Sequence, residues 1–182
     1  MNRFDFRPLA RSDFAQLAHW LRQPHVARWW ADDPSPEALE ADYGGVIDGT
    51  EPCDVFIALH GVRPFGLAQR LRWDAYPDYL AELRRLVPAP PDDAYSIDYL
   101  VGEMSDTGRG LGSAMIGAFV RRLWNDKPEA AAVIVPVHAH NAASWRVLER
   151  NGFQRLASGE LEPDNPADTR DHHIYGVERP SG

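Results

Sequence analysis

One stretch of the sequence has the composition of a loop that binds an anion. It contains Ser105, Asp106, Thr107, Gly108, Arg109, Gly110, Leu111, Gly112 and Ser113. The stretch follows a strand-like segment and opens a segment with helical periodicity. The first turn of a helix has unpaired N–H groups and a partial positive charge, and glycines let a ligand approach the backbone. We expect a phosphate-bearing ligand here, although a tight strand-to-helix turn without a ligand gives the same pattern.

Two common phosphate loops are excluded by their spacing. A dinucleotide fingerprint that starts at Gly108 requires a glycine at position 113, where this chain has Ser113. A P-loop requires a lysine followed by serine or threonine, and this stretch contains no lysine. What remains is Gly-x-Gly directly before an amphipathic helix, a pattern that is not specific by itself.

A second motif lies downstream of the glycine loop. It consists of Asn141, Ala142, Ala143, Ser144, Trp145, Arg146, Val147, Leu148, Glu149, Arg150, Asn151, Gly152 and Phe153. Together the two motifs resemble the acetyl-CoA-binding core of the GNAT N-acetyltransferase superfamily. Residues 107–112 resemble its pyrophosphate loop, and residues 141–153 resemble the strand–helix motif that follows that loop. Both motifs occur in the family's order, and they cover roughly residues 94–155.

The N-terminal part narrows the resemblance. His19-Trp20-Leu21 and His25-Val26-Ala27-Arg28-Trp29-Trp30 resemble the N-terminal helix pair of aminoglycoside 6′-N-acetyltransferases. Residues 96–103 resemble the acidic strand that precedes their glycine loop. The resemblance implies acetyl-CoA as cosubstrate and direct transfer of the acetyl group to a primary amine, above all the 6′-amino group of an aminoglycoside.

The resemblance also assigns roles to residues of this chain. Asp98 is the candidate carboxylate that orients the amine and takes its proton, directly or through water. A structural acid that caps the next turn is the alternative for this residue. Backbone N–H groups around Leu100 and Val101 are expected to bind the pantetheine arm and polarise the thioester carbonyl. The other expected contacts to acetyl-CoA are Thr107, Gly108, Arg109, Gly110, Leu111, Gly112, Ser113, Asn141 and Ser144.

The sequence departs from the family pattern at two positions. The first position of the pyrophosphate loop is Thr107 instead of glutamine or arginine, which leaves the backbone contacts intact. The helix position that often holds a tyrosine, the proposed proton donor to the leaving thiolate, is Leu148. That general acid is therefore absent, or Tyr99, Tyr175 or a water molecule replaces it.

A polycationic acceptor requires several carboxylates and aromatic walls. Residues 74–93 form a long insertion that carries Asp74, Tyr76, Asp78, Glu82, Asp92 and Asp93, directly after Trp73. The last loop carries Glu160, Glu162, Asp164, Asp168 and Asp171. As acceptor-binding residues we single out Trp29, Trp30, Trp73, Asp74, Tyr76 and Asp171. Each acid alone is more typical of a solvated surface and Trp29 and Trp30 of a core, so the prediction concerns the cluster.

Histidines provide a rival to Asp98. His138 and His140 alternate on one face of a strand end, and either could act as the base. A zinc site is excluded because no third ligand lies within reach in the sequence. His172 and His173 are candidate pocket residues, although exposed strand histidines are the commoner case.

These motifs lie on an alternating succession of predicted strands and helices. Strands are predicted at 3–9, 53–60, 65–73, 94–101, 131–137, 153–159 and 172–177. Helices are predicted after Ser12-Asp13, after Ser35, and at 79–87, 111–124 and 141–152. The strand–loop–helix–strand order around residue 110 implies one parallel pair. We predict a single α+β domain over residues 1–182, an α/β sandwich with a GNAT-type mixed, mostly antiparallel central sheet flanked by helices.

Composition excludes several classes of protein. The 182 residues are 44% apolar and 25% charged, as in an ordinary globular domain. The net charge of −8 disfavours nucleic acid and anionic membranes and favours cationic small molecules. Cys53 is the only cysteine, so an intrachain disulfide is excluded and a reducing compartment is expected. No apolar run is long enough for a membrane span, and residues 1–5 lack a signal-peptide core, so we expect a cytoplasmic protein.

Three functions stay open on the sequence. The first is acetylation of an aminoglycoside or similar polyamine. The second is acetylation of another amine, such as a siderophore hydroxylysine, a protein N-terminus or a metabolite. The third is a non-catalytic acyl-CoA-binding module, which Leu148 favours slightly. A monomer and a homodimer are both compatible with the sequence.

Overall fold

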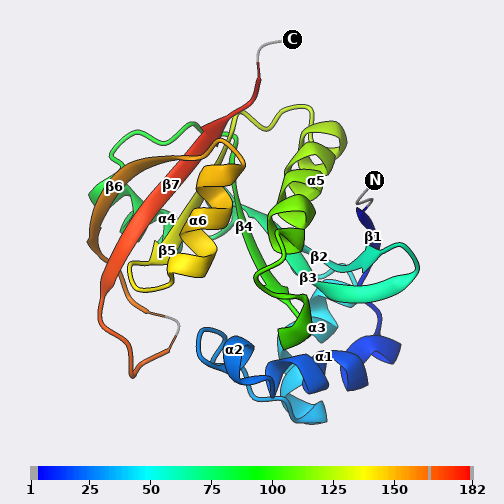
Figure 1. Ribbon diagram of the computed structural model, residues 1–182. Helices are drawn as coiled ribbons and strands as arrows, with labels where there is room; N and C mark the ends of the chain where they lie inside the picture. Colours follow the sequence, from blue (N-terminus) through cyan, green and yellow to red (C-terminus); the bar gives the residue numbers. More distant parts are fainter. Residues whose placement is uncertain (1–3, 164, 181–182) are drawn as a thin grey trace.

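The central feature of the fold is one seven-stranded sheet with the strand order β1-β2-β3-β4-β5-β7-β6 (Figure 1). The computed structural model describes residues 4–163 and 165–180. The strands are β1 (Phe4–Pro8), β2 (Cys53–His60), β3 (Arg63–Arg72), β4 (Ala94–Val101), β5 (Ala132–His138), β6 (Gln154–Glu160) and β7 (Asp171–Glu178). The α+β class with a mixed, mostly antiparallel sheet is therefore confirmed.

The one parallel pair is β4 and β5, as the βαβ order predicts. The other neighbouring strands pair antiparallel. Among the described residues, β4 and β5 pair only at Ala94↔Ala132 and Tyr95↔Val133. Beyond these pairs the two strands diverge (Figure 1). One edge of β4 from Ser96 to Val101 consequently has no strand partner, whereas its other edge stays paired with β3.

Helices cover both faces of the sheet. The helices are α1 (Phe14–Leu21), α2 (Pro24–Ala27), α3 (Pro36–Ile47), α4 (Pro77–Leu86), α5 (Leu111–Asp126) and α6 (Ala142–Arg150). Three short 3-10 turns, η1 (Arg11–Asp13), η2 (Trp73–Ala75) and η3 (Met104–Asp106), precede α1, α4 and the glycine loop. None of the helices in the described part of the chain is long and apolar enough to cross a bilayer.

Strand β4 divides the core because its side chains alternate between the two faces. Tyr95 and Ile97 pack with α5, in a cluster that includes Met115 and Phe119. Leu100 packs on the opposite face with residues of α1 and α3. Neighbouring residues of β4 therefore have different surroundings, which matters for the site that lies at the end of this strand.

Local signals predict most element boundaries, and the differences have local causes. Ser35 caps α3 as expected, since its Oγ accepts a hydrogen bond from the N–H of Ala38. Asp13 is the N-cap residue of α1, as the Ser12-Asp13 signal predicts, but its side chain makes no capping hydrogen bond to that helix. The Asp13 carboxylate accepts from the Ala10 N–H and pairs with Arg7, so it is turned away from the helix. The strand predicted at 65–73 spans Arg63–Arg72, because Trp73 already belongs to η2.

Candidate active site

A cavity of about 370 Å³ lies at the C-terminal end of β4. Four segments that are distant in the sequence line it: α2 with its following turn, the end of β4, the glycine loop and α6. The divergence of β4 from β5 makes this convergence possible, since α6 follows β5 and the glycine loop follows β4. The cavity is thus a consequence of sheet topology. Residues of both sequence motifs line it.

The glycine loop supplies backbone N–H groups to the cavity. Gly108 and Gly110 have φ angles of 71° and 78°, a left-handed conformation that strains other residues. Gly110 is the N-cap of α5, and no side chain of the described residues caps that helix end. The N–H groups of the first turn therefore remain available, and the partial positive charge of the helix end favours an anion.

The structure sorts the predicted loop residues by their contact with the cavity. The cavity is lined by Thr107, Gly108, Gly110, Gly112 and Ser113. Leu111 instead packs into the core, and Arg109 is exposed outside the lining. The cationic side chains at the cavity are Arg146 and Arg150, one turn apart on α6. Our sequence analysis missed Arg150, which its i, i+4 spacing from Arg146 could have indicated.

The first turn of α6 is held by Asn141. Its Oδ1 accepts a hydrogen bond from the N–H of Ser144 at 3.2 Å, so the expected helix cap is present. Asn141 and Ser144 both line the cavity. Gly152, with φ 83°, ends the motif after α6, as predicted. The motif therefore presents one polar helix end to the same cavity as the glycine loop.

Tyr99 joins β4 to α6 across the cavity wall. Its hydroxyl lies 2.9 Å from Ser144 Oγ and 3.2 Å from the Ser144 carbonyl oxygen. Burial raises the pKa of Tyr99 well above its usual value, although the hydrogen bond from Ser144 lowers it in part. The phenol therefore keeps its proton at neutral pH and can act as a hydrogen-bond donor.

The other two candidate positions for a proton donor, Leu148 and Tyr175, are not part of the cavity lining. Leu148 is fully buried in the core cluster. Tyr175 is also fully buried, and its hydroxyl donates to Glu149 at 2.9 Å. Of the two tyrosines, Tyr99 is the one that the described cavity includes.

Asp98 lies beside Tyr99 in the chain but on the other face of β4. Its Oδ2 accepts a hydrogen bond from Nε2 of Gln69, its register partner on β3, at 3.2 Å. Burial, followed by the negative charge of Asp98, raises the pKa of Cys53 to about 12. These neighbours place Asp98 on the α1–α3 side of the sheet, outside the described cavity lining. Strand β4 thus separates a carboxylate on one face from the cavity on the other.

The predicted aromatic walls are divided between two places. Trp29 and Trp30 line the cavity. The guanidinium of Arg28 lies 4.1 Å from the centroid of the Trp29 ring and also pairs with Asp168 at 2.8 Å. That guanidinium holds the pKa of Asp168 below its usual value. The α2 wall is thereby tied to the loop between β6 and β7.

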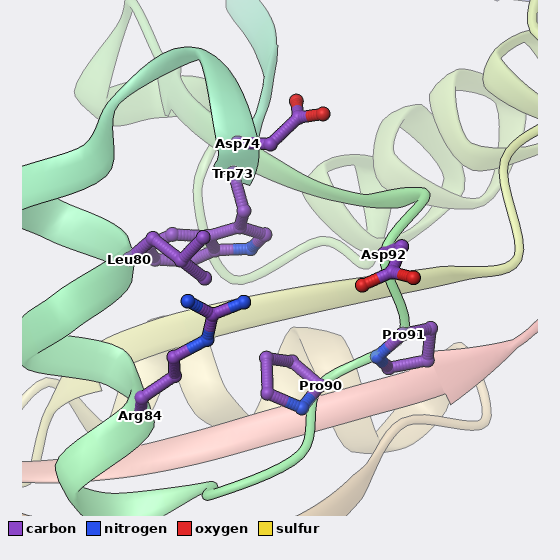
Figure 2. Close-up of a pocket in the computed structure, with 7 residues that line it drawn as sticks. All are labelled: Trp73, Asp74, Leu80, Arg84, Pro90, Pro91 and Asp92. Carbon is purple, nitrogen blue, oxygen red and sulfur yellow. The ribbon is translucent and has the colours of Figure 1, made fainter.

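The remaining predicted acceptor residues lie outside the cavity lining. Trp73 and Asp74 line a separate cavity of about 180 Å³, into which Arg84 extends from α4 toward the Trp73 ring (Figure 2). Trp73 is buried, and its indole N–H donates to the Ile134 carbonyl. Tyr76 stacks on Tyr79. Asp171 is exposed at the start of β7. Asp164 lies outside the described residues.

Two of the candidate histidines, His138 and His172, have ring nitrogens that are hydrogen-bonded to the backbone, whereas His140 contributes its backbone N–H. His138 Nε2 donates to the Thr169 carbonyl at 3.1 Å, and its Nδ1 accepts from the His140 N–H at 3.2 Å. His172 Nδ1 lies 2.8 Å from the Arg170 carbonyl. Both nitrogens of His138 are thus occupied, which disfavours it as a base. Within residues 4–163 and 165–180, no group of three or more potential ligands is arranged to hold a metal ion.

Comparisons with known proteins show the family and the fold of this chain. The model of the GNAT acetyltransferase domain family matches residues 10–161. Aminoglycoside N(6′)-acetyltransferase type 1 of Klebsiella pneumoniae is 26% identical over 172 residues, which cover 88% of this chain and 78% of that protein. Lysine N-acyltransferase MbtK of Mycobacterium tuberculosis is 23% identical over 98% of this chain and 79% of its own length.

A solved structure has the same fold. The crystal structure of aminoglycoside acetyltransferase AAC(6′)-Ib in complex with coenzyme A superposes with a TM-score of 0.82. The two chains are 23% identical, and the superposition covers 97% of this chain and 95% of the other. The likeness extends over nearly the whole described chain, so it includes the sheet, the diverging strands and both motif helices.

Proposed function

This chain belongs to the GNAT acetyltransferase family, and from that membership we propose that it transfers the acetyl group of acetyl-CoA to a primary amine of an aminoglycoside, at the 6′-amino group. Two lines of similarity support the choice of acceptor. The matched protein of Klebsiella pneumoniae is an aminoglycoside N(6′)-acetyltransferase. A structural neighbour, AAC(6′)-Ib, has been solved with coenzyme A and kanamycin.

The observation that carries the proposal is the uncapped first turn of α5 at the cavity. Gly108 and Gly110 leave the backbone of this turn open to a ligand, and the N–H groups suit a diphosphate. Arg146 and Arg150 add positive charge in the same cavity. These groups fit the coenzyme, which supplies an activated acetyl thioester when it is bound.

The acceptor amine needs a group that removes its proton, because free alkylamines are mostly protonated at neutral pH. We assign this role to Asp98, either directly or through water. Because Asp98 lies on the α1–α3 face of β4, the assignment requires the amine to approach from that side, past the part of β4 that does not pair with β5. Gln69 holds one carboxylate oxygen of Asp98, which fixes the orientation of the group. The negative charge of Asp98 also attracts a cationic substrate.

We assign the second polar role to Tyr99. It remains protonated, lines the cavity and lies within hydrogen-bond distance of Ser144. In that position its hydroxyl can turn from Ser144 to donate a hydrogen bond to a leaving group with negative charge. In this assignment Tyr99 on β4 supplies the hydroxyl that family members often carry on α6, at the position of Leu148.

A second acceptor class is a lysine-type amine, such as a siderophore hydroxylysine. The similarity to lysine N-acyltransferase MbtK, which spans 98% of this chain, favours this candidate. The predicted acceptor residues Trp29, Trp30, Trp73, Asp74, Tyr76 and Asp171 remain part of the proposal, of which Trp29 and Trp30 have the support of the cavity lining. A cytoplasmic location, a small-molecule partner and a monomer or homodimer remain parts of it as well.

The test is a two-stage assay with purified protein. Coenzyme A binding is measured first by calorimetry, and thiol release from acetyl-CoA is then followed with kanamycin, a lysine derivative and a peptide with a free N-terminus. Turnover with kanamycin and mass-spectrometric assignment of the product to the 6′-amine supports the proposal. Turnover with the lysine derivative alone selects the second acceptor class. Binding without turnover on any amine identifies a non-catalytic coenzyme-binding module.

A further inference from the structure

His25 connects two walls of the cavity by one hydrogen bond. The residue lies in α2, and its Nε2 is 2.8 Å from the carbonyl oxygen of Val101 at the end of β4. A carbonyl oxygen only accepts hydrogen bonds, so Nε2 must carry the hydrogen. In the neutral ring, Nδ1 then carries a lone pair and acts as an acceptor.

That lone pair has no partner within the described residues, although Nδ1 is buried. Two other buried polar atoms lack a hydrogen bond by geometry, but each faces an opposite charge. Arg70 Nη1 is 3.0 Å from Asp126, and Asp106 Oδ2 is 2.8 Å from Arg63. A buried acceptor without any donor is costly, because it has lost its hydrogen bonds to water. His25 Nδ1 is therefore the atom for which a missing partner has to be sought.

The residue borders the cavity, where a bound molecule would supply the missing donor. His25 lines the cavity together with Val101, Trp29 and Gly108. We propose that His25 Nδ1 accepts a hydrogen bond from an N–H group of a molecule bound in this cavity. The inference rests on the proposed function, since it presumes that the cavity binds acetyl-CoA and an amine.

The arrangement forms a chain of two hydrogen bonds. The ligand N–H donates to Nδ1, and Nε2–H donates to the Val101 carbonyl. Each bond polarises the imidazole and strengthens the other. His25 is thus a positioning residue. Through its hydrogen bond to Val101, it couples ligand binding to the contact between α2 and β4.

Two sources can supply the N–H group: an amide of the pantetheine arm or the acceptor amine. The experiment separates them with His25→Gln, because a glutamine side chain keeps an N–H near the Nε2 position and loses the Nδ1 acceptor. His25→Asn keeps an acceptor oxygen near the Nδ1 position and loses the N–H at the Nε2 position, because its side chain is shorter. His19→Gln is the matched control: His19 is exposed on the neighbouring α1 and is not part of the described lining. Circular dichroism and thermal melting verify that each variant is folded.

The first measurement is calorimetry with coenzyme A alone, followed by the KM for kanamycin at saturating acetyl-CoA. Loss of one hydrogen bond weakens an interaction roughly 3- to 10-fold. A weaker coenzyme A affinity of that size in His25→Gln supports the inference and identifies the pantetheine amide. An unchanged coenzyme A affinity with a KM raised by that factor supports it and identifies the acceptor amine. Values equal to wild type in both arms overturn it, as do equal losses in His25→Gln and His25→Asn.

A second readout does not depend on activity. The ¹⁵N signals of the His25 ring report whether the Nδ1 lone pair accepts a hydrogen bond. We expect the Nδ1 signal to move on saturation with the ligand identified above, while Nε2 keeps its hydrogen; an unmoved Nδ1 signal overturns the inference. Failure of the wild-type protein to bind coenzyme A would instead overturn the proposed function, so the two failures are distinguishable.

Discussion

Asp98 and Tyr99 are adjacent in the chain, yet β4 directs them to opposite faces of the sheet. Asp98 contacts Gln69 on β3, whereas Tyr99 contacts Ser144 on α6. Alternation along an extended strand produces this separation, because successive side chains point to opposite sides. The two proposed roles, proton removal from the amine and hydrogen bonding to the leaving group, therefore belong to opposite sides of β4. The two residues lead to separate predictions.

Replacement of Asp98 by asparagine removes the proposed proton acceptor but keeps the size of the side chain. We expect kcat/KM for the amine to fall roughly 100- to 10,000-fold, the usual contribution of a general base. The residual rate should rise steadily with pH as more of the amine is free of its proton. Glu178→Gln, at an exposed acid at the end of β7, serves as control and should leave the rate unchanged. A pH–rate profile of Asp98→Asn that overlays the wild type removes Asp98 from the chemistry.

Replacement of Tyr99 by phenylalanine removes only the hydroxyl at the cavity. We expect kcat to fall roughly 100-fold, at the lower end of acid–base contributions, with little change in coenzyme A affinity. Tyr175→Phe is the control because its hydroxyl is bound to Glu149 away from the lining. That variant should melt at a lower temperature without a selective loss of kcat. Steady-state kinetics measure kcat, and calorimetry measures the affinity for coenzyme A. Equal kcat values for Tyr99→Phe and wild type would contradict the role of Tyr99 as a hydrogen-bond donor to the leaving group.

At the scale of the element, the turn into α5 depends on glycine for its conformation. A Cβ at Gly110 would meet no atom within 4 Å, so the cost of Gly110→Ala comes from its φ of +78° and not from space. We expect a loss of about 1–2 kcal/mol in unfolding free energy. We also expect weaker coenzyme A binding, because the turn relaxes away from the geometry that presents its N–H groups.

Gly49→Ala provides a matched control for that turn. Gly49 has a φ of +73° and equally open surroundings, but it follows α3 and does not line the cavity. Denaturant unfolding should show a similar destabilisation in both variants, whereas calorimetry should show weaker coenzyme A binding in Gly110→Ala alone. Equal coenzyme A affinities in the two variants would contradict a direct role of the α5 turn.

At the scale of the molecule, the packing of the N-terminal strand against η1 responds to pH. The Arg7 guanidinium donates two hydrogen bonds of 2.7 Å to Asp13 and holds the pKa of that carboxyl below its usual value. The folded state therefore binds this proton less readily than the unfolded chain. The stabilisation is present above the unfolded pKa of about 3.9 and is lost as pH falls through the folded pKa.

Asp13→Asn should accordingly lower the unfolding free energy at neutral pH by about 2 kcal/mol, as for a hydrogen bond to a charged group. The difference from wild type should shrink below about pH 4. Urea unfolding between pH 3 and pH 7 measures both. Asp92→Asn, at an exposed loop position, is the control and should change stability little at any pH. A difference between Asp13→Asn and wild type that stays constant with pH would contradict the linkage.

Features that short stretches of chain encode can be predicted from the amino-acid order alone. Left-handed φ angles at Gly108 and Gly110, the Asn141 cap of α6 and the alternation of β4 each depend on a few neighbouring residues. Their order predicted the parallel pair of β4 and β5. Local steric rules and helix capping are sufficient for these features, whereas the assignment of the loop and helix to a coenzyme site came from the resemblance of the two motifs to the family.

The contacts between side chains that are distant in the sequence could not be predicted and follow from the tertiary structure. Trp29 borders the cavity, whereas Trp73 packs in a separate core, although both belong to the same predicted aromatic wall. The contacts of Tyr99 with Ser144 and of His25 with Val101 likewise join elements that are remote in sequence. Such contacts depend on strand register and on the point at which β4 leaves β5, and both are set by packing of the whole sheet rather than by residues near the contact.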